Sequence, residues 1–128
     1  SLDGFMYVGD SITDIEAFRL VRGVGGLAVS FNGNQYAVRE VDIAILSKSS
    51  LATALVAEAF AELGREGVLR LAEDWGPNAL CGEMGDRFFA LQEPPRVIRV
   101  TPDNVEQIVR ESNAFRRTVR GVAVGSLG

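Results

Sequence analysis

The first third of the chain alternates short apolar runs with a helical pattern. Residues 5–8 are apolar without alternation, which is typical of a strand covered on both faces, as in parallel sheets. Apolar residues then recur every three positions over residues 13–22, which predicts a helix. Two further apolar runs, at 27–31 and 41–46, predict a second and a third strand. The pattern therefore predicts a βαβαβ unit with parallel strands.

Polar residues indicate where the helices of this unit begin. Thr13, with Glu16 three residues later, fits a capping box, so the first helix is expected to open near Thr13. Asn34 can cap a short helix that runs through Glu40.

After residue 48 the pattern becomes mainly helical. Ser49 or Ser50 can cap a helix that ends at Gly64, and a second helix is expected to end before Gly76. Residues 78–92 show no clean period, and the lone cysteine in this stretch, Cys81, is interpreted as a small packing residue.

A strand and a helix are expected near the end of the chain. The segment 96–100 predicts a short strand. Thr101 and Pro102 are typical of a helix cap followed by proline at the first helical position, and this helix is expected to run to about Thr118. Residues 121–128 are interpreted as a frayed end.

These elements predict an α/β protein built as a partial Rossmann-like parallel three-layer sandwich. Residues 1–48 would form the βαβαβ core portion, and residues 49–128 a helical extension with a short strand near 96–100. A chain of 128 residues is expected to pack as one domain. Exposed strand edges in such a unit invite pairing with another chain, so we expect a homodimer, or later helices packed over the exposed sheet face.

The composition restricts the available chemistry. The chain has one cysteine and no histidine, which excludes an internal disulfide, a multi-cysteine zinc site and imidazole catalysis. Oxygen ligands remain, and they favour hard cations such as Mg²⁺ and phosphate-type ligands. The net charge of −4 argues against nucleic-acid binding. No apolar run approaches the roughly 20 residues of a membrane span, so we expect a cytoplasmic protein without membrane attachment.

Two aspartates come after the first predicted strand. Asp10 would leave the carboxyl end of the strand, and Asp14 would lie in the first helical turn, so both could face the crevice where open α/β sheets bind ligands. A Mg²⁺ ion would offset their mutual repulsion, and the adjacent helix N-terminus would favour a phosphate. Alternatively, Asp10 is a turn residue and Asp14 an ordinary acid of the first helical turn.

A family resemblance lies in the segment Val8–Asp14, whose sequence is Val-Gly-Asp-Ser-Ile-Thr-Asp. It resembles the fourth motif of the haloacid dehalogenase (HAD) superfamily, a Gly-Asp-x-x-x-Asp box that comes after a buried strand. Residues 26–34 and 37–45 are similar to the segment that comes after that box in Cof-type and phosphoserine-phosphatase-like members. The resemblance covers about residues 5–47 and implies a HAD-like fold for this part.

The resemblance also implies Mg²⁺-dependent phosphoryl transfer through an aspartyl-phosphate, with a phosphorylated small molecule as substrate. Asp10 and Asp14 would hold or support the metal, Asp10 more directly. Ser11 and Thr13 would support the loop or approach the phosphate. Asn32 could reach a substrate, because the equivalent turn borders the pocket in relatives, although Asn-Gly is also an ordinary turn signal.

The chain departs from the family in its missing nucleophile. Such enzymes carry an Asp-x-Asp nucleophile, then a Ser/Thr and a Lys, upstream of the fourth motif. Here nine residues precede Asp10, Asp3 has no aspartate two positions later, and Lys48 lies downstream. We therefore assign no catalytic residue and predict that the chain alone cannot hydrolyse a phosphate ester. The leading hypothesis is the C-terminal part of a HAD-like phosphatase whose N-terminal half lies outside this sequence.

Two other hypotheses remain open. The chain could be a non-catalytic HAD-like subunit or scaffold that binds a protein partner through residues 50–120; similar sequences occur among uncharacterised archaeal proteins. It could also be a receiver-like domain, but that fold needs a phosphoacceptor aspartate after the third strand, where this chain has Ser47 and Lys48.

The late helix is basic. Its arginines could meet an acidic partner or form a solvated face, and they are Arg110, Arg116, Arg117 and Arg120.

Overall fold

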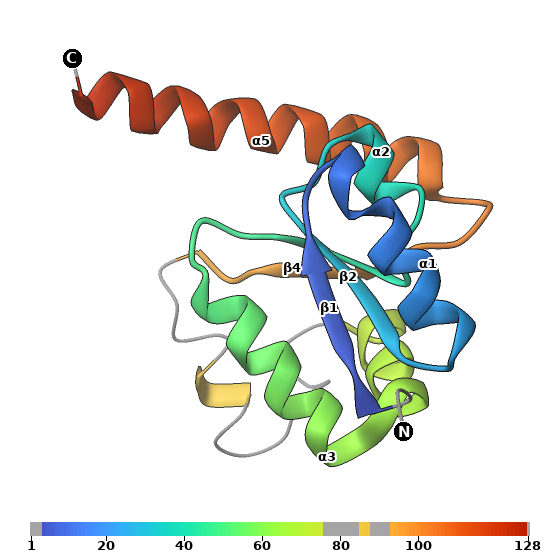
Figure 1. The fold of residues 1–128 in the computed structure, drawn as a ribbon. Coiled ribbons are helices and arrows are strands. Elements are labelled where there is room, and N and C mark those ends of the chain that lie inside the picture. The colour runs from blue at the N-terminus through green and yellow to red at the C-terminus, as the bar shows by residue number, and fades with distance from the viewer. Residues whose placement is uncertain (1–3, 76–84, 88–92, 128) are drawn as a thin grey trace.

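The computed structural model describes residues 4–75, 85–87 and 93–127, the last seven of these by their backbone (Figure 1). Cys81 and most of residues 78–92 lie outside the described residues. The elements in chain order are β1 (Met6–Gly9), the 3₁₀ turn η2 (Ile12–Asp14), α1 (Ile15–Gly23), β2 (Leu27–Phe31), α2 (Gln35–Val38), β3 (Ile43–Leu46), α3 (Leu51–Glu73), β4 (Arg96–Arg99) and α5 (Val105–Leu127).

The four strands form one sheet in the order β1-β2-β3-β4. The first three strands are parallel, with Met6 opposite Leu27 and Val29 opposite Ile43. β4 runs antiparallel to β3, with Leu46 opposite Arg96. The predicted α/β class is therefore confirmed, with a βαβαβ unit followed by a mainly helical segment that contains one short strand.

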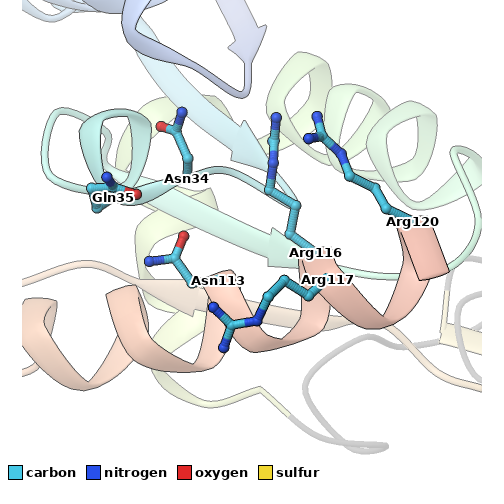
Figure 2. Close-up of a pocket in the computed structure, with 6 residues that line it drawn as sticks. All are labelled: Asn34, Gln35, Asn113, Arg116, Arg117 and Arg120. Atoms are coloured by element: carbon cyan, nitrogen blue, oxygen red, sulfur yellow. The ribbon is translucent and has the colours of Figure 1, made fainter.

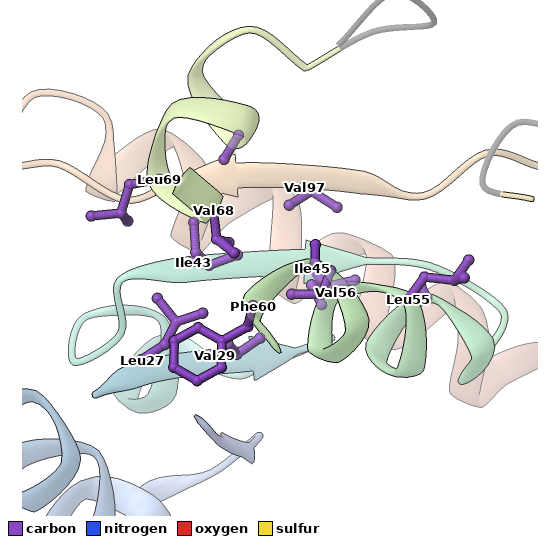
Figure 3. Close-up of a cluster of buried hydrophobic side chains, with 13 residues drawn as sticks. Leu27, Val29, Ile43, Ile45, Leu55, Val56, Phe60, Val68, Leu69 and Val97 are labelled. Atoms are coloured by element: carbon purple, nitrogen blue, oxygen red, sulfur yellow. The ribbon is translucent and has the colours of Figure 1, made fainter. Parts of the chain in front are cut away.

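One face of the sheet is covered by α3 (Figures 1 and 3). Successive side chains of a strand point to opposite faces, and on this face every second residue of β2 and β3 is buried. The cluster that they form with α3 and β4 includes Leu27, Val29, Ile43, Ile45, Leu55, Val56, Phe60, Val68, Leu69 and Val97.

The opposite face is covered by α1, α2 and α5. Ala28 lies under Phe18 of α1, and Ala44 lies under Ile108 of α5. Because helices cover both faces, β2 and β3 have buried residues on both sides, which explains why their sequences are apolar without alternation.

β1 differs from β2 and β3 in its exposure. Among the described strands it lies at the edge of the sheet, and all four of its residues are half-buried. The apolar run at residues 5–8 predicts a strand covered on both faces. In the structure β1 is less buried than this prediction.

The first helix begins differently from the prediction. α1 starts at Ile15 after the 3₁₀ turn, and the residue that reaches back to the turn is Asp14, whose Oδ2 accepts the Ser11 N–H at 3.2 Å. The proposed pair of Thr13 and Glu16 was therefore wrong by two residues, because the Ser11–Asp14 pair has the same spacing two residues earlier. Asn34 caps α2 as predicted: its Oδ1 accepts the N–H groups of the second and third residues after it.

The last helix begins later and ends later than predicted. Thr101 to Asn104 form a turn closed by Asn104, whose Oδ1 accepts the Thr101 N–H at 2.8 Å and whose Nδ2 donates to the Arg99 carbonyl at 2.9 Å. α5 begins at Val105 and continues to Leu127 instead of ending near Thr118.

The predicted break at Gly64 is confirmed within α3. Gly64 has φ +71°, a left-handed conformation that favours glycine and that divides α3 into two helical pieces. The turn brings Arg65 to the amino ends of β2 and β3, where it donates to the Gly26 carbonyl at 2.9 Å and forms an ion pair with Asp42 at 2.8 Å.

Candidate functional site

The loop after β1 is organised by the carboxylate of Asp14. Its Oδ1 accepts the Tyr7 hydroxyl at 2.8 Å. Its Oδ2 accepts the backbone N–H of Asp10 at 2.8 Å and that of Ser11 at 3.2 Å. One carboxylate oxygen thus binds strand β1 and the other binds the loop, and Asp14 acts first as the residue that holds Asp10 in place.

Gly9 leaves the space that Asp14 needs. A Cβ atom at Gly9 would lie 2.3 Å from Cγ and 2.5 Å from Oδ2 of Asp14. The sequence Gly-Asp-x-x-x-Asp therefore has a local physical reason: the glycine admits the second aspartate, and that aspartate binds the N–H of the first.

These hydrogen bonds affect the ionisation of Asp14 and Tyr7. Burial raises the pKa of Asp14, but the hydrogen bonds from Asp10 N–H, Tyr7 OH and Ser11 N–H outweigh it and lower the pKa below its usual value. The hydrogen bond to Asp14 in turn raises the pKa of Tyr7, because an ionised phenol could not donate it.

The lowered pKa of Asp14 predicts a stability that depends on pH. A carboxyl with a lower pKa in the folded state stabilises the fold above its unfolded pKa of about 3.9, and this contribution disappears as the pH falls through the folded pKa. Urea unfolding from pH 3 to 7 should show that Asp14→Asn is less stable than the parent chain by an amount that is constant above about pH 5 and shrinks below about pH 4. A gap that stays constant down to pH 3 would contradict this assignment.

Asp10 lies at the carboxyl end of β1, between the turn after β2 and helix α5. Its carboxylate is half-exposed, at 51%, and its Oδ2 lies 3.1 Å from Nη1 of Arg116. The Asp10 carbonyl accepts the Asn34 N–H at 2.9 Å and also Arg116 Nη1 at 3.2 Å. Asp10 is therefore presented toward solvent at the crevice that the sequence predicts, with an arginine beside it.

Asn32 is used within the fold. It has φ +49°, which asparagine tolerates better than most residues, and it is 9% exposed. Its Nδ2 donates to the Ser47 carbonyl at 2.8 Å, and its Oδ1 accepts the Ser47 N–H at 3.0 Å, so the amide joins the ends of β2 and β3. Contact of Asn32 with a substrate stays a prediction, and this geometry assigns its side chain a structural task.

The other two candidate residues lie on the outside of the loop. The hydroxyl oxygens of Ser11 and Thr13 are 2.9 Å apart in an exposed hydrogen bond. They are the hydroxyls of this loop that remain accessible to an approaching ligand.

Arg116 is the site residue that sequence reasoning did not identify. Its side chain is 15% exposed, and its Nη1 also donates to the Asn32 carbonyl at 2.9 Å. Ser112, one turn earlier on α5, donates to the Gly33 carbonyl at 2.6 Å and fixes the helix against the same turn. The guanidinium therefore lies where the ends of β1 and β2 meet. The available sequence signal was the spacing of basic residues along one helix.

The described residues offer an incomplete ligand set for a metal. No group of three or more His, Cys, Asp or Glu side chains among them is arranged to hold a metal ion. Mg²⁺ is commonly bound by one or two carboxylates together with water, so Asp10 fits as one ligand. Asp10 also lines a hollow of about 180 Å³ whose other lining residues are Phe31, Asn32, Arg116, Val119 and Arg120.

Comparisons with known proteins give a structural relative. No family model matches the chain, and no curated protein matches it. The chain is similar to the solved structure of gene product AF1437 from Archaeoglobus fulgidus, with 29% sequence identity and a TM-score of 0.67. The match covers 91% of this chain and 32% of that chain, so this chain spans about a third of the length of its relative. None of the helices in the described part of the chain is long and apolar enough to cross a membrane.

Proposed function

We propose that this chain is the C-terminal part of a HAD-like, Mg²⁺-dependent phosphatase that hydrolyses phosphomonoesters. The observation that supports this most is the presentation of Asp10 at the end of β1 by a loop that Asp14 holds with three hydrogen bonds. Asp10 would be one ligand of the metal, and Asp14 would support it. A bound Mg²⁺ would neutralise charge on the transferring phosphoryl group.

The exposed edge of β1 is consistent with a further strand that pairs with it in the full-length protein. An apolar run such as residues 5–8 is typical of a central strand, yet β1 is half-buried at an edge of the described sheet. A strand of the N-terminal half could pair there at about 4.8 Å. If it ran parallel to β1, its carboxyl end would bring a nucleophilic aspartate next to Asp10. The relative from Archaeoglobus is long enough to contain such a half, since this chain covers 32% of it.

Arg116 affects how tightly the 128-residue chain by itself can bind Mg²⁺. Its guanidinium lies 3.1 Å from Asp10 Oδ2 and already offsets the charge of that carboxylate. Mg²⁺ would have to share or take over the carboxylate, so we expect the chain alone to bind Mg²⁺ weakly. Without the nucleophile, Ser/Thr and Lys motifs, it is expected to be inactive.

The test uses the full-length protein that contains this chain. With p-nitrophenyl phosphate and Mg²⁺ we expect hydrolysis that EDTA abolishes and that Asp10→Asn lowers by at least about 100-fold, because metal stabilisation of the transition state contributes several kcal/mol. Asp103→Asn is the control, because Asp103 is an exposed acid outside this crevice. Activity that survives both EDTA and Asp10→Asn, or a full-length protein without an upstream Asp-x-Asp, would contradict the proposal.

The alternative is a non-catalytic HAD-like subunit whose β1 edge binds a protein partner or a second copy of the chain. It is favoured by two apolar side chains that flank β1 in the chain, Phe5 and Ile12, each 55% exposed. A stable complex on co-purification, together with no phosphatase activity in the full-length protein, would support this alternative over the enzyme.

A further inference from the structure

A second hollow lies between α2 and α5, and Asp10 is not among its lining residues. It has a volume of about 550 Å³, within the range of about 300–1,000 Å³ that is usual for small-molecule sites. Figure 2 shows its lining residues, which are Asn34, Gln35, Asn113, Arg116, Arg117 and Arg120.

The spacing of residues along α5 creates this lining. Asn113, Arg116, Arg117 and Arg120 lie at positions i, i+3, i+4 and i+7, which share one face of a helix. In Figure 2, Arg116 and Arg120 extend from α5 toward the same side, and Arg117 lies along the helix toward Asn113. Three guanidinium groups thus border one hollow together with the amide side chains of Asn34, Gln35 and Asn113.

The charge of the hollow contrasts with that of the chain. The protein has a net charge of −4, and most of its described arginines pair with a carboxylate, as Arg19 does with Glu40. Within the described part of the chain, Arg117 and Arg120 have neither an ion pair nor a hydrogen bond, and no carboxylate lines the hollow. Arg117 and Arg120 therefore bring positive charge to this hollow that no carboxylate among the described residues pairs with.

Arg116 adds a fixed donor to the lining of the hollow. Its three hydrogen bonds, to the Asp10 carbonyl, the Asp10 carboxylate and the Asn32 carbonyl, all come from Nη1. Nε and Nη2 of the same guanidinium have no such bond in the described residues. A guanidinium held on one side can offer the N–H groups of its other side to an anion at little further cost in side-chain entropy.

We propose that this hollow is a binding site for a small molecule that carries one or more phosphate groups. Planar guanidinium groups suit phosphate oxygens because they donate two parallel hydrogen bonds. The amides of Gln35 and Asn113 would contact the uncharged part of the ligand. The site needs no metal, so it is independent of the phosphatase proposal, although Arg116 and Arg120 line both hollows.

Isothermal titration calorimetry of the 128-residue chain in EDTA tests the site. Inorganic pyrophosphate, orthophosphate and ribose 5-phosphate are the probes, and EDTA removes any contribution of a metal at Asp10. We expect saturable 1:1 binding of at least one probe and a loss of at least tenfold in affinity in the double variant Arg117→Gln/Arg120→Gln. The charge-matched control is Arg70→Gln/Arg110→Gln, which removes two arginines that lie outside the hollow and should change the affinity less than twofold.

The outcomes separate the possible sources of binding. Tighter binding of ribose 5-phosphate than of orthophosphate would indicate an organic phosphate, and the reverse order a free phosphate; either supports the site. Equal losses in the two double variants would overturn the proposal, because they would indicate nonspecific charge attraction. Absence of binding, or binding of a polyglutamate peptide in preference to every phosphate, would overturn it as well. Circular dichroism of both double variants checks that they are folded. We expect no change in the spectrum, because all four arginines are exposed.

Discussion

Replacement of Asp42 by alanine is expected to lower the free energy of unfolding by about 3–5 kcal/mol, because it leaves buried polar groups without their partner. The Asp42 side chain is 4% exposed and lies between Arg22, at 3.2 Å, and Arg65, at 2.8 Å. Its Oδ2 also accepts the Ala28 N–H at 3.0 Å. One carboxylate thus connects α1, β2 and the second half of α3. Urea unfolding monitored by circular dichroism gives the value.

The control for Asp42 is an exposed ion pair on the same side of the molecule. Glu40→Gln breaks the pair with Arg19, whose side chain is 67% exposed, and should cost less than about 1 kcal/mol. If Asp42→Ala does not fold, Asp42→Asn retains the shape and an acceptor for Ala28 and should still be clearly less stable than the parent. A loss below about 1 kcal/mol in Asp42→Ala would show that this carboxylate does not hold the elements together.

Replacement of Phe18 by alanine should have an effect of similar size, about 3–5 kcal/mol, because it leaves a cavity in the core. Phe18 is 0% exposed and packs its ring against Tyr7 in an edge-to-face contact, with ring centroids 5.6 Å apart. Tyr7 donates to Asp14, so Phe18 also supports the loop that presents Asp10.

Leu20 provides the matched control for Phe18. It lies on the same helix and is 61% exposed, so Leu20→Ala should change stability by no more than about 0.5 kcal/mol. Chemical denaturation of both variants under the same conditions makes the comparison. Similar losses in the two variants would contradict the packing described for α1.

The order of the first elements could be predicted because its signals are local. The apolar runs of β2 and β3, the cap at Asn34 and the break at Gly64 each depend on a few neighbouring residues. The same local reasoning located Asp10 at the end of β1. It did not locate the start of α1 correctly, because Ser11–Asp14 and Thr13–Glu16 offer the same spacing two residues apart.

The contacts of the site could not be predicted in the same way. Arg116 and Asp10 are separated by 106 positions, and nothing in the basic pattern of α5 indicates which arginine would reach the crevice. The partner of Asp42 in α3, Arg65, is likewise 23 positions away and depends on the direction in which the chain leaves Gly64. Both pairings are consequences of how whole helices cross the sheet.

By itself, the sequence determined the α/β class, the parallel βαβαβ unit and the position of the two aspartates, since hydrophobic periodicity and turn chemistry act over a few residues. The tertiary structure alone decided how those aspartates are used. Asp14 turns inward to hold the loop, Asp10 faces outward beside Arg116, and Arg117 and Arg120 line a hollow against α2. The reason is physical: hydrogen bonds and ion pairs need atoms within about 3 Å, and only packing brings distant segments that close.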